Sequence, residues 1–417
     1  MRRAFRWCIS PDHRSLSLVV LILLVSTFVA FGTGFWLLFR LTYVIALTVP
    51  VCWFIAWYNT RGLHVVAERR TDRAQVGQEA QEVIEVYNRG ILPRLWVEVE
   101  DPSGLPRHRS RRVIVVPPKR MRSWIVDTPL VKRGLYEWGP VRLVATDPFG
   151  LFRRVKYFGG AQQILVFPPV VDLPRFVAPP ANLPGEGRFR RRTHYITPNA
   201  SGIREYLPGD AYSRIHWRST ARTGELMVKT FELDPASDIY IVLDLERRIA
   251  AGSGEESTEE YAVRVAASIA RHYLVANRSV GYISFGDRLQ VLEPERGQNQ
   301  LTRIFETLAT VQATGDAPLG NILQEEQRRF GRHTTLVVIT SATDDQWLTA
   351  IQSLTQRGVR AAVVLIDPSS FGGRNSPLVI FGELAASDIL TYVVRKGDDL
   401  GLALSPSAGP GVSSWQA

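Results

Sequence analysis

Two long apolar runs dominate the first sixty residues of the chain. Residues 15–39 contain no charged side chain, and a second uncharged run from 41 to 60 follows a single Arg40. A membrane-spanning helix needs about 20 apolar residues, so this stretch is long enough for two. Because Gly32-Thr33-Gly34 interrupts it, we expect a transmembrane hairpin over residues 15–58, with helices at 15–31 and 35–58.

Arginines flank this hairpin on both sides. Short loops rich in Lys and Arg stay in the cytoplasm, so the pattern predicts a multi-pass anchor with a cytoplasmic N-terminus at 1–14 and the bulk of the chain cytoplasmic. A cleaved signal peptide is the alternative, but the second apolar run and the lack of an A-x-A-like site after the first argue against it. The flanking residues are Arg2, Arg3, Arg6 and Arg14 before the hairpin and Arg61, Arg69, Arg70 and Arg73 after it.

Short segments of alternating apolar and polar residues follow over residues 62–172. Examples are EVIEVYNRG and RLWVEVEDPSG, and most of the segments end at or beside Gly, Pro, Asn or Asp. A two-residue period with frequent turn residues is typical of antiparallel strands, so we expect an all-β, sandwich-like domain. Asp147-Pro148-Phe149-Gly150 is interpreted as one of its turns.

A Pro-, Gly- and Arg-rich stretch over residues 173–200 is typical of a linker. Its basic run at 188–192 either contacts head groups or an acidic partner, or is simply solvated.

After residue 237 continuous apolar runs such as DIYIVLDLE and TTLVVITSA alternate with amphipathic helices, the first opened by a capping box of Ser257 and Glu260. This predicts a doubly wound α/β domain with a mainly parallel sheet over 237–404, followed by a disordered tail at 405–417.

Composition and charge narrow the function classes. The formal net charge is +10 and the pI about 9.8, which favours anionic partners such as acidic lipids, nucleic acid or acidic protein faces. Cys8 and Cys52 are the only cysteines, and neither sits in a C-x-x-C or Cys/His cluster. The sequence therefore suggests neither a disulfide framework nor a zinc site.

Common enzyme motifs are missing from the sequence. It contains no G-x-x-x-x-G-K-[ST], G-x-G-x-x-G, G-x-S-x-G or H-E-x-x-H motif in the required context. Open α/β sheets bind ligands at the carboxyl ends of their strands, which directs attention to Asp244, Ser341 and Asp367.

The most distinctive stretch lies just before the α/β pattern, in a segment over residues 201–236. It reads GDAYSRIHWRSTARTGELMVKTFE from Gly209 to Glu232. Asp210 is the expected N-cap of a helix over 211–222 that Gly224 closes, and ELMVKTFEL is expected to form an edge strand. On that helix Arg214, Arg218 and Arg222 recur every four residues as one stripe, available for internal salt bridges or for a partner.

A catalytic interpretation of this stretch makes His216 a general base oriented by Glu205 or Asp210. No serine or cysteine nucleophile stands at a persuasive place, because Ser213 and Ser219 are ordinary helix-surface residues. A structural role for His216 is the alternative.

The same residues carry a family resemblance. GIREYLPGDAYSRIHWRSTARTGELMVKTFE resembles the signature of the bacterial domain-of-unknown-function-58 family, and residues 133–154 (RGLYEWGPVRLVATDPFGLFRR) are similar to the family's preceding stretch. The matching positions are Arg204, Tyr206, Gly209, Asp210, Arg214, Ile215, Trp217, Ala221, Arg222, Leu226, Val228, Lys229, Phe231 and Glu232. The resemblance implies a location in the bacterial inner membrane and an association with MoxR-type AAA+ ATPases and transglutaminase-like membrane proteins.

The order of elements also resembles a von Willebrand factor A domain, whose metal site is an Asp-x-Ser-x-Ser loop helped by a threonine and a second aspartate. Here the loop reads DLERR, so Asp244 matches while Glu246 and Arg248 replace the two hydroxyl residues. The later aspartate position holds Ser341 or Ala342. An arginine among the ligands would repel a cation, so we expect a degenerate site at Asp244 without metal.

The main hypothesis is a non-enzymatic, membrane-anchored adaptor or scaffold that needs no cofactor and has no catalytic residues. The second is a hydrolase or phosphate-handling enzyme that uses His216, Asp210 and the arginine stripe. Nucleic-acid binding ranks third, because only Phe189 interleaves the basic run. The residues expected to bind a partner or clamp the domains are Arg204, Asp210, Arg214, His216, Trp217, Arg218, Arg222 and Lys229.

Overall fold

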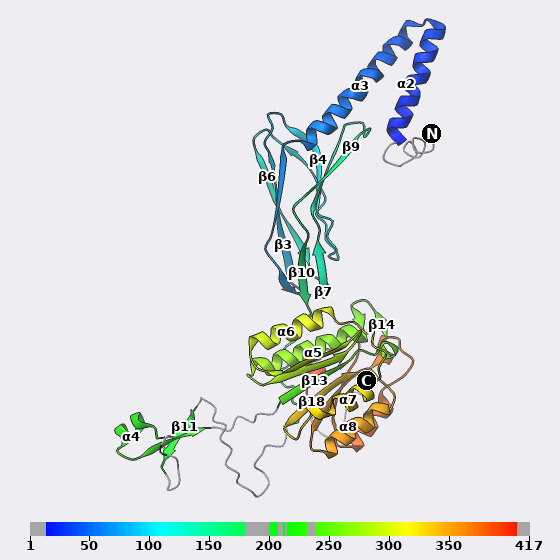
Figure 1. Ribbon diagram of the computed structural model, residues 1–417. Coiled ribbons are helices and arrows are strands. Elements are labelled where there is room, and N and C mark those ends of the chain that lie inside the picture. The colour runs from blue at the N-terminus through cyan, green and yellow to red at the C-terminus, as the bar shows by residue number, and fades with distance from the viewer. Residues whose placement is uncertain (1–13, 180–199, 207–211, 213–214, 232–237, 407–417) are drawn as a thin grey trace. The chain divides into compact units, whose positions relative to one another are not determined.

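A computed structural model describes residues 14–179, 200–206, 212, 215–231 and 238–406. The chain divides into two compact units between Phe167 and Pro168 (Figure 1). The N-terminus at 1–13, the basic run at 188–192 and the tail from 407 onward fall outside the described residues, as do Asp210 and Arg214.

The first unit begins with two apolar helices, α2 (Arg14–Thr33) and α3 (Trp36–Thr60), which confirm the predicted helical pair. The chain reverses at Gly34, whose φ of +66° lies in the left-handed region that glycine tolerates best. Ser26 Oγ and Thr42 Oγ1 lie 2.9 Å apart between the helices. By length and composition both helices qualify as membrane spans.

The rest of the first unit is built from strands arranged in three sheets, with the orders β1-β3-β6, β2-β10-β7 and β5-β4-β8-β9. Paired strands run antiparallel, as predicted, except the parallel pair β2 and β10. Buried positions alternate along β3, which places apolar residues such as Ile84 in a core cluster. The strands are β1 (Leu63–Arg69), β2 (Arg73–Gln75), β3 (Glu79–Asn88), β4 (Arg94–Glu100), β5 (Arg112–Val116), β6 (Met121–Pro129), β7 (Gly134–Trp138), β8 (Val141–Thr146), β9 (Arg153–Phe158) and β10 (Gln162–Phe167).

The end of α3 is bonded to these strands. Asn59 is buried, and its side-chain amide makes two hydrogen bonds to the backbone of Leu95. It donates to the carbonyl at 3.1 Å and accepts from the N–H group at 3.4 Å. Lys156 Nζ donates to the carbonyl of Thr60 at 2.8 Å. The bond to Thr60 satisfies a carbonyl that the C-terminal end of a helix leaves open, and the bonds of Asn59 satisfy backbone groups of β4.

The predicted turn at Asp147 is present. Its carboxylate accepts from the amide of Phe149 at 3.0 Å and from that of Phe152 at 2.6 Å.

The second unit contains a six-stranded sheet in the order β17-β16-β13-β18-β19-β20. All neighbours in it are parallel except the edge strand β17, which runs antiparallel to β16. Figure 1 shows α5 and α6 on one side of this sheet and α7 and α8 on the other. The alternation of strands and helices confirms the predicted α/β pattern. The strands are β13 (Asp238–Asp244), β16 (Val280–Phe285), β17 (Leu289–Glu295), β18 (Thr334–Thr340), β19 (Arg360–Ile366) and β20 (Leu390–Val394); the helices are α5 (Thr258–Val275), α6 (Gln298–Thr310), α7 (Leu319–Glu325), α8 (Gln346–Gln356), α9 (Leu378–Ala386) and α10 (Leu400–Ala403).

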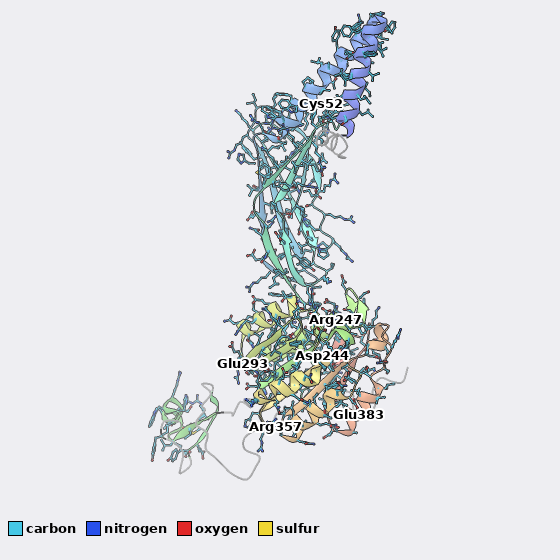
Figure 2. All side chains as sticks on the ribbon, turned by 45° about the vertical axis from the view of Figure 1, so that its right-hand side comes forward. Cys52, Asp244, Arg247, Glu293, Arg357 and Glu383 are labelled. Atoms are coloured by element: carbon cyan, nitrogen blue, oxygen red, sulfur yellow. The ribbon has the colours of Figure 1, made fainter. Side chains whose placement is uncertain are left out.

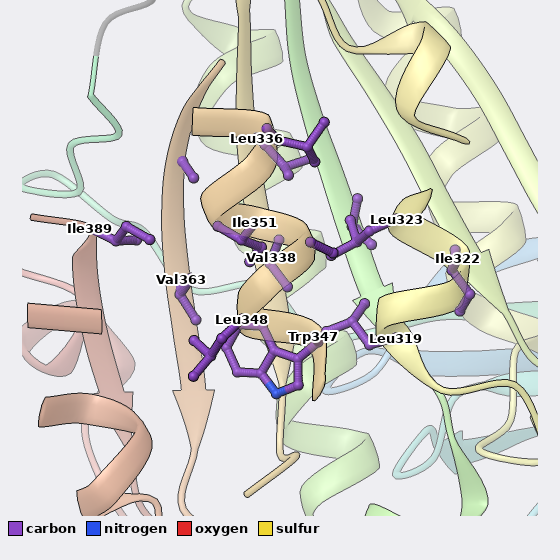
Figure 3. Packing of buried hydrophobic residues seen from close by; sticks show 14 of the residues in the cluster. Leu319, Ile322, Leu323, Leu336, Val338, Trp347, Leu348, Ile351, Val363 and Ile389 are labelled. Carbon is purple, nitrogen blue, oxygen red and sulfur yellow. The ribbon is translucent and has the colours of Figure 1, made fainter. Parts of the chain in front are cut away.

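One apolar core cluster of this unit lies between the sheet and the helices α7 and α8. Every position of β18 is buried, as a continuous apolar run predicts. Figure 3 shows Trp347 and Ile351 of α8 beside Val338 of β18 and Leu323 of α7. On α5, Ser257 accepts a hydrogen bond from the amide of Glu260 at 3.3 Å, as the capping box requires.

Residues 168–179, which we call the strap, pack on the α/β unit before the sheet begins. Leu173 and Phe176 are buried, and the ring centroid of Phe176 lies 5.2 Å from that of Tyr392. The hydroxyl of Tyr392 donates to the carbonyl of Val177 at 2.7 Å, and the hydroxyl of Tyr273 accepts from the amide of Ala178 at 2.9 Å. Part of the stretch assigned to the linker therefore belongs to the α/β unit.

The segment just before β13 contains a hairpin of β11 (Ala200–Glu205) and β12 (Met227–Phe231) with the helix α4 (Trp217–Thr223) between them. The helix predicted over 211–222 begins only at Trp217, so its predicted start was wrong. Ile215 forms a β-bridge with Val228, and the amide of His216 donates to the carbonyl of Met227 at 2.8 Å. Because the backbone of Ile215 and His216 pairs with β12, these two residues are not part of the helix. Gly224 closes the helix at φ +80°, as predicted.

Candidate functional site

The carboxyl edge of the sheet has its switch point between β13 and β18. From β13 the chain first adds β16 and β17 on one side, then returns to add β18, β19 and β20 on the other. Side chains at the ends of β13 and β18 therefore meet where open α/β sheets bind ligands. These residues are Asp244 and Thr340.

Asp244 is held by a short network inside this edge. Thr340 Oγ1 donates to its Oδ2 at 2.6 Å, and the amide of Glu246 donates to its Oδ1 at 3.2 Å. Burial raises the pKa of Asp244 to about 6, although both hydrogen bonds oppose this, and the nearby carboxylates of Glu246 and Asp344 raise it further. Figure 2 marks the position of Asp244 among the side chains of the unit.

The two residues that replace hydroxyls in the loop after β13 pair with each other. Glu246 is buried, and its Oε1 lies 2.5 Å from the guanidinium of Arg248. The hydroxyl of Ser341 donates to the carbonyl of Ile249 at 3.0 Å. A cation at Asp244 would have to compete with Arg248 for Glu246, so this donor set does not favour one.

Asp367, at the end of β19, has a local structural role. Its carboxylate caps the short 3-10 helix that follows by accepting from the amide of Ser369 at 3.0 Å. Its other oxygen lies 3.6 Å from Nε of Arg395.

The hairpin brings several of the predicted partner-binding residues onto one small element. His216, Trp217, Arg218 and Arg222 are on α4 or at its start. The β11–β12 register places Arg204 opposite Val228, and Lys229 opposite Ile203. Arg214 lies outside the described residues, so of the expected arginine stripe only Arg218 and Arg222 are placed on α4.

His216 and Ser219 contact each other within the hairpin. Nδ1 of His216 lies 2.8 Å from Oγ of Ser219, and His216 is the N-cap residue of α4. The hydroxyl of Thr220 accepts from the amide of Met227 at 3.0 Å, which ties α4 to β12.

The outer face of the hairpin presents aromatic and cationic side chains. Trp217 is 67% exposed and Tyr212 is 73% exposed, and the ring of Tyr212 stacks on Tyr206 at a centroid distance of 5.9 Å. Arg218 and Arg222 are exposed, and no ion pair joins either of them to a residue that the structure describes.

Sequence reasoning missed Thr340 as the partner of Asp244, having pointed to its neighbour Ser341. The available signal was a hydroxyl residue at the last position of an apolar strand. It was not decisive, because the register of β13 and β18 determines which hydroxyl faces the carboxylate.

Comparisons with solved structures give weak matches. Proximal thread matrix protein 1 from the mussel byssus is 12% identical with a TM-score of 0.31, over 40% of this chain and 46% of that one. The CARDB domain of a Pyrococcus furiosus protein is 14% identical with a TM-score of 0.19, over 25% of this chain and 91% of that one.

Similar sequences extend further along the chain. The uncharacterized protein YeaD of Bacillus subtilis is 22% identical over 409 residues, which cover 95% of this chain and 98% of that protein. The uncharacterized protein Rv1480 of Mycobacterium tuberculosis is 23% identical over 202 residues, which cover 46% of this chain and 61% of that protein. Residues 202–372, which include most of the hairpin and the sheet edge at Asp244, match the family described as "Protein of unknown function DUF58".

Proposed function

We propose that the protein is a membrane-anchored, non-enzymatic adaptor whose α/β unit binds protein partners. In this proposal α2 and α3 form a multi-pass anchor in the bacterial inner membrane, and the bulk of the chain lies in the cytoplasm. The arginines on both flanks of the helices support this orientation. The antiparallel strand pairs and two apolar clusters of the first unit support a sandwich-like spacer.

The α/β unit is proposed to be of the von Willebrand factor A type. Its central strand β13 ends in Asp244, and an antiparallel edge strand completes an otherwise parallel sheet. Asp244, Thr340, Glu246 and Arg248 bond to one another, which supports a structural rather than a catalytic role for this edge.

The observation that carries the proposal is the exposed face of the hairpin. Tryptophan and arginine contribute most strongly to protein interfaces, and Trp217, Arg218 and Arg222 present them from one short helix. The guanidinium groups favour an acidic partner through bidentate pairing. The family resemblance points to a MoxR-type AAA+ ATPase as that partner, with a transglutaminase-like membrane protein as a further member of the assembly.

Affinity capture of the full-length protein from detergent-solubilised membranes tests this function. We expect a stable partner with the wild type and its loss in Trp217→Ala and in the double variant Arg218→Glu/Arg222→Glu. Arg288→Glu reverses one charge at an exposed turn elsewhere, half the charge change of the double variant, and should retain the partner. Recovery of no partner by the wild type, or equal recovery by all variants, would contradict the proposal.

The contact between His216 and Ser219 favours one second candidate, a hydrolase. It predicts turnover of generic ester or phosphate-ester substrates by the purified protein, abolished in His216→Ala. Full cellular function in folded His216→Ala and Asp210→Asn variants would eliminate this candidate.

A further inference from the structure

A buried ionic cluster lies in the β-rich unit, away from the hairpin and the sheet edge. The side chains of Glu82 and Asp101 are 0% exposed, and that of Arg69 is 5% exposed. Nε of Arg69 lies 3.1 Å from Oε1 of Glu82, and its Nη2 lies 3.3 Å from Oδ2 of Asp101. The register of β1 and β3 sets Arg69 directly opposite Glu82.

His108 completes the cluster. One ring nitrogen of His108 and one oxygen from each of Glu82 and Asp101 lie within 4.8 Å of one another. With both carboxyl groups ionised, three buried atoms have no hydrogen-bond partner: Oε2 of Glu82, Oδ1 of Asp101 and Nε2 of His108. Buried polar atoms are nearly always paired, so three unpaired atoms at one point indicate something that they jointly bind.

The surrounding residues fix the direction of these atoms. Nδ1 of His108 lies 2.8 Å from Oγ1 of Thr128, and its ring meets Trp138 edge-on at a centroid distance of 5.9 Å. If Nδ1 carries the hydrogen and donates to Thr128, the lone pair of Nε2 remains free. Burial lowers the pKa of His108, although Asp101 opposes the shift.

We propose that Glu82, Asp101 and His108 bind one divalent transition-metal ion, with Zn²⁺ the best fit to their ligand types. Zinc accepts imidazole nitrogen and carboxylate oxygen together, whereas Ca²⁺ and Mg²⁺ prefer oxygen alone. Ligands at about 2.0–2.1 Å from zinc lie roughly 3.3 Å apart in a tetrahedron, so the ligand atoms would close in by up to about 1.5 Å.

Arg69 holds the two carboxylates in place from one side, although its positive charge opposes a nearby cation as that of Arg248 does at Asp244. Its Nε and Nη2 bond to one oxygen of each carboxylate, which leaves the other oxygen for the ion. The ion would join β3 to the segment that follows β4, and would thereby cross-link two sheets of the unit. Its role is therefore structural stabilisation of the β-rich unit.

The competing occupant is a proton. Burial and the neighbouring Asp101 raise the pKa of Glu82 to about 7, and the two carboxyl groups lie close enough to share a hydrogen bond when one is protonated. A shared proton satisfies the two carboxyl oxygens, and with the ring hydrogen on Nε2 the histidine accepts from Thr128 and donates from Nε2. With the ring hydrogen on Nδ1, metal binding accounts for all three atoms.

The test uses the full-length protein in detergent, stripped with a chelator and titrated with Zn²⁺. We expect His108→Ala and Glu82→Gln to bind Zn²⁺ at least about tenfold more weakly than the wild type. His64→Ala is the matched control, because His64 is an exposed histidine of the neighbouring strand β1 and should leave the affinity unchanged. Zinc should also raise the melting temperature of the wild type and of the control.

Two further measurements do not depend on ligand variants that fold. Co²⁺ added to the stripped wild type should produce the visible absorption of a metal bound by nitrogen and oxygen, and Zn²⁺ should abolish it. Thr128→Val keeps all three ligands, removes the hydrogen bond to His108 and should weaken Zn²⁺ about 10–100-fold. Absence of the Co²⁺ spectrum, or equal Zn²⁺ affinity in the wild type and His108→Ala, would overturn the proposal in favour of a shared proton.

Discussion

Replacement of Asp244 by asparagine tests the electrostatics of the sheet edge. Asp244 is 6% exposed, and burial raises its pKa from the ordinary 3.8 to about 6. Asparagine keeps the size of the side chain and removes its titration. The comparison of the two proteins therefore isolates the contribution of this one carboxyl group to the pH dependence of stability.

The sign and size follow from proton linkage. Between about pH 4 and 6 the folded protein retains a proton on Asp244 that the unfolded chain has released, so its free energy of unfolding falls as the pH rises. A difference of about 2 pH units corresponds to about 3 kcal/mol. Relative to the wild type, Asp244→Asn should gain about this amount between pH 4 and 7, with no further gain above pH 7.

Hydrogen exchange of peptides from β13 and β18 measures this gain. Both proteins are compared at the same pH, so the intrinsic exchange rate cancels. The ratio of the protection factors of Asp244→Asn and the wild type should change about a hundredfold between pH 4 and 7. Glu383→Gln, an exposed carboxyl on α9, is the control and should change little. A wild-type to Asp244→Asn ratio that is constant from pH 4 to 7 would refute the reasoning.

Three further substitutions test the packing. Phe176→Ala should destabilise the α/β unit by about 3–5 kcal/mol, since it empties a buried aromatic site. Urea unfolding measures this loss, and a midpoint equal to that of the exposed control Arg175→Ala would contradict the packing of the strap on the α/β unit. Gly224→Ala should cost about 1–2 kcal/mol through backbone strain at φ +80°, seen as faster amide exchange in β12; unchanged exchange would argue against this helix end. Asn59→Ala should cost about 1–3 kcal/mol by leaving both backbone groups of Leu95 unpaired, and undiminished protection of that amide would contradict the contact.

Periodicity was sufficient to predict the elements that bury a continuous apolar face. The two apolar helices, the antiparallel strands and the alternating α/β pattern all follow from local spacing, and the structure contains them. The start of α4 could not be predicted this way. It depends on the pairing of Ile215 with Val228, which is a contact between positions that local propensity does not connect.

The candidate sites show the same limit. Asp244 was found because it ends an apolar strand, whereas Thr340 as its partner depends on the register of β13 against β18. Glu82, Asp101 and His108 were missed altogether, because metal-site motifs were sought among closely spaced cysteines and histidines. Strand pairing brings these three together from different segments. In the sequence each is an ordinary polar residue of a strand or loop, which does not indicate a site.

The bonds at the end of the strap bear on whether the α/β unit tolerates replacement of the stretch 180–237. The hydroxyl of Thr335 on β18 donates to the carbonyl of Pro179 at 3.1 Å, and Asp238, the first residue of β13, pairs with Thr334 on the same strand. Pro179 and Asp238 thus lie at adjoining positions of β18. Because the two ends of the stretch 180–237 are close together, a short glycine-rich bridge in its place should leave the remaining sheet able to close. The hairpin is in this sense an exchangeable module, and its loss or replacement during evolution would not require the α/β unit to be rebuilt.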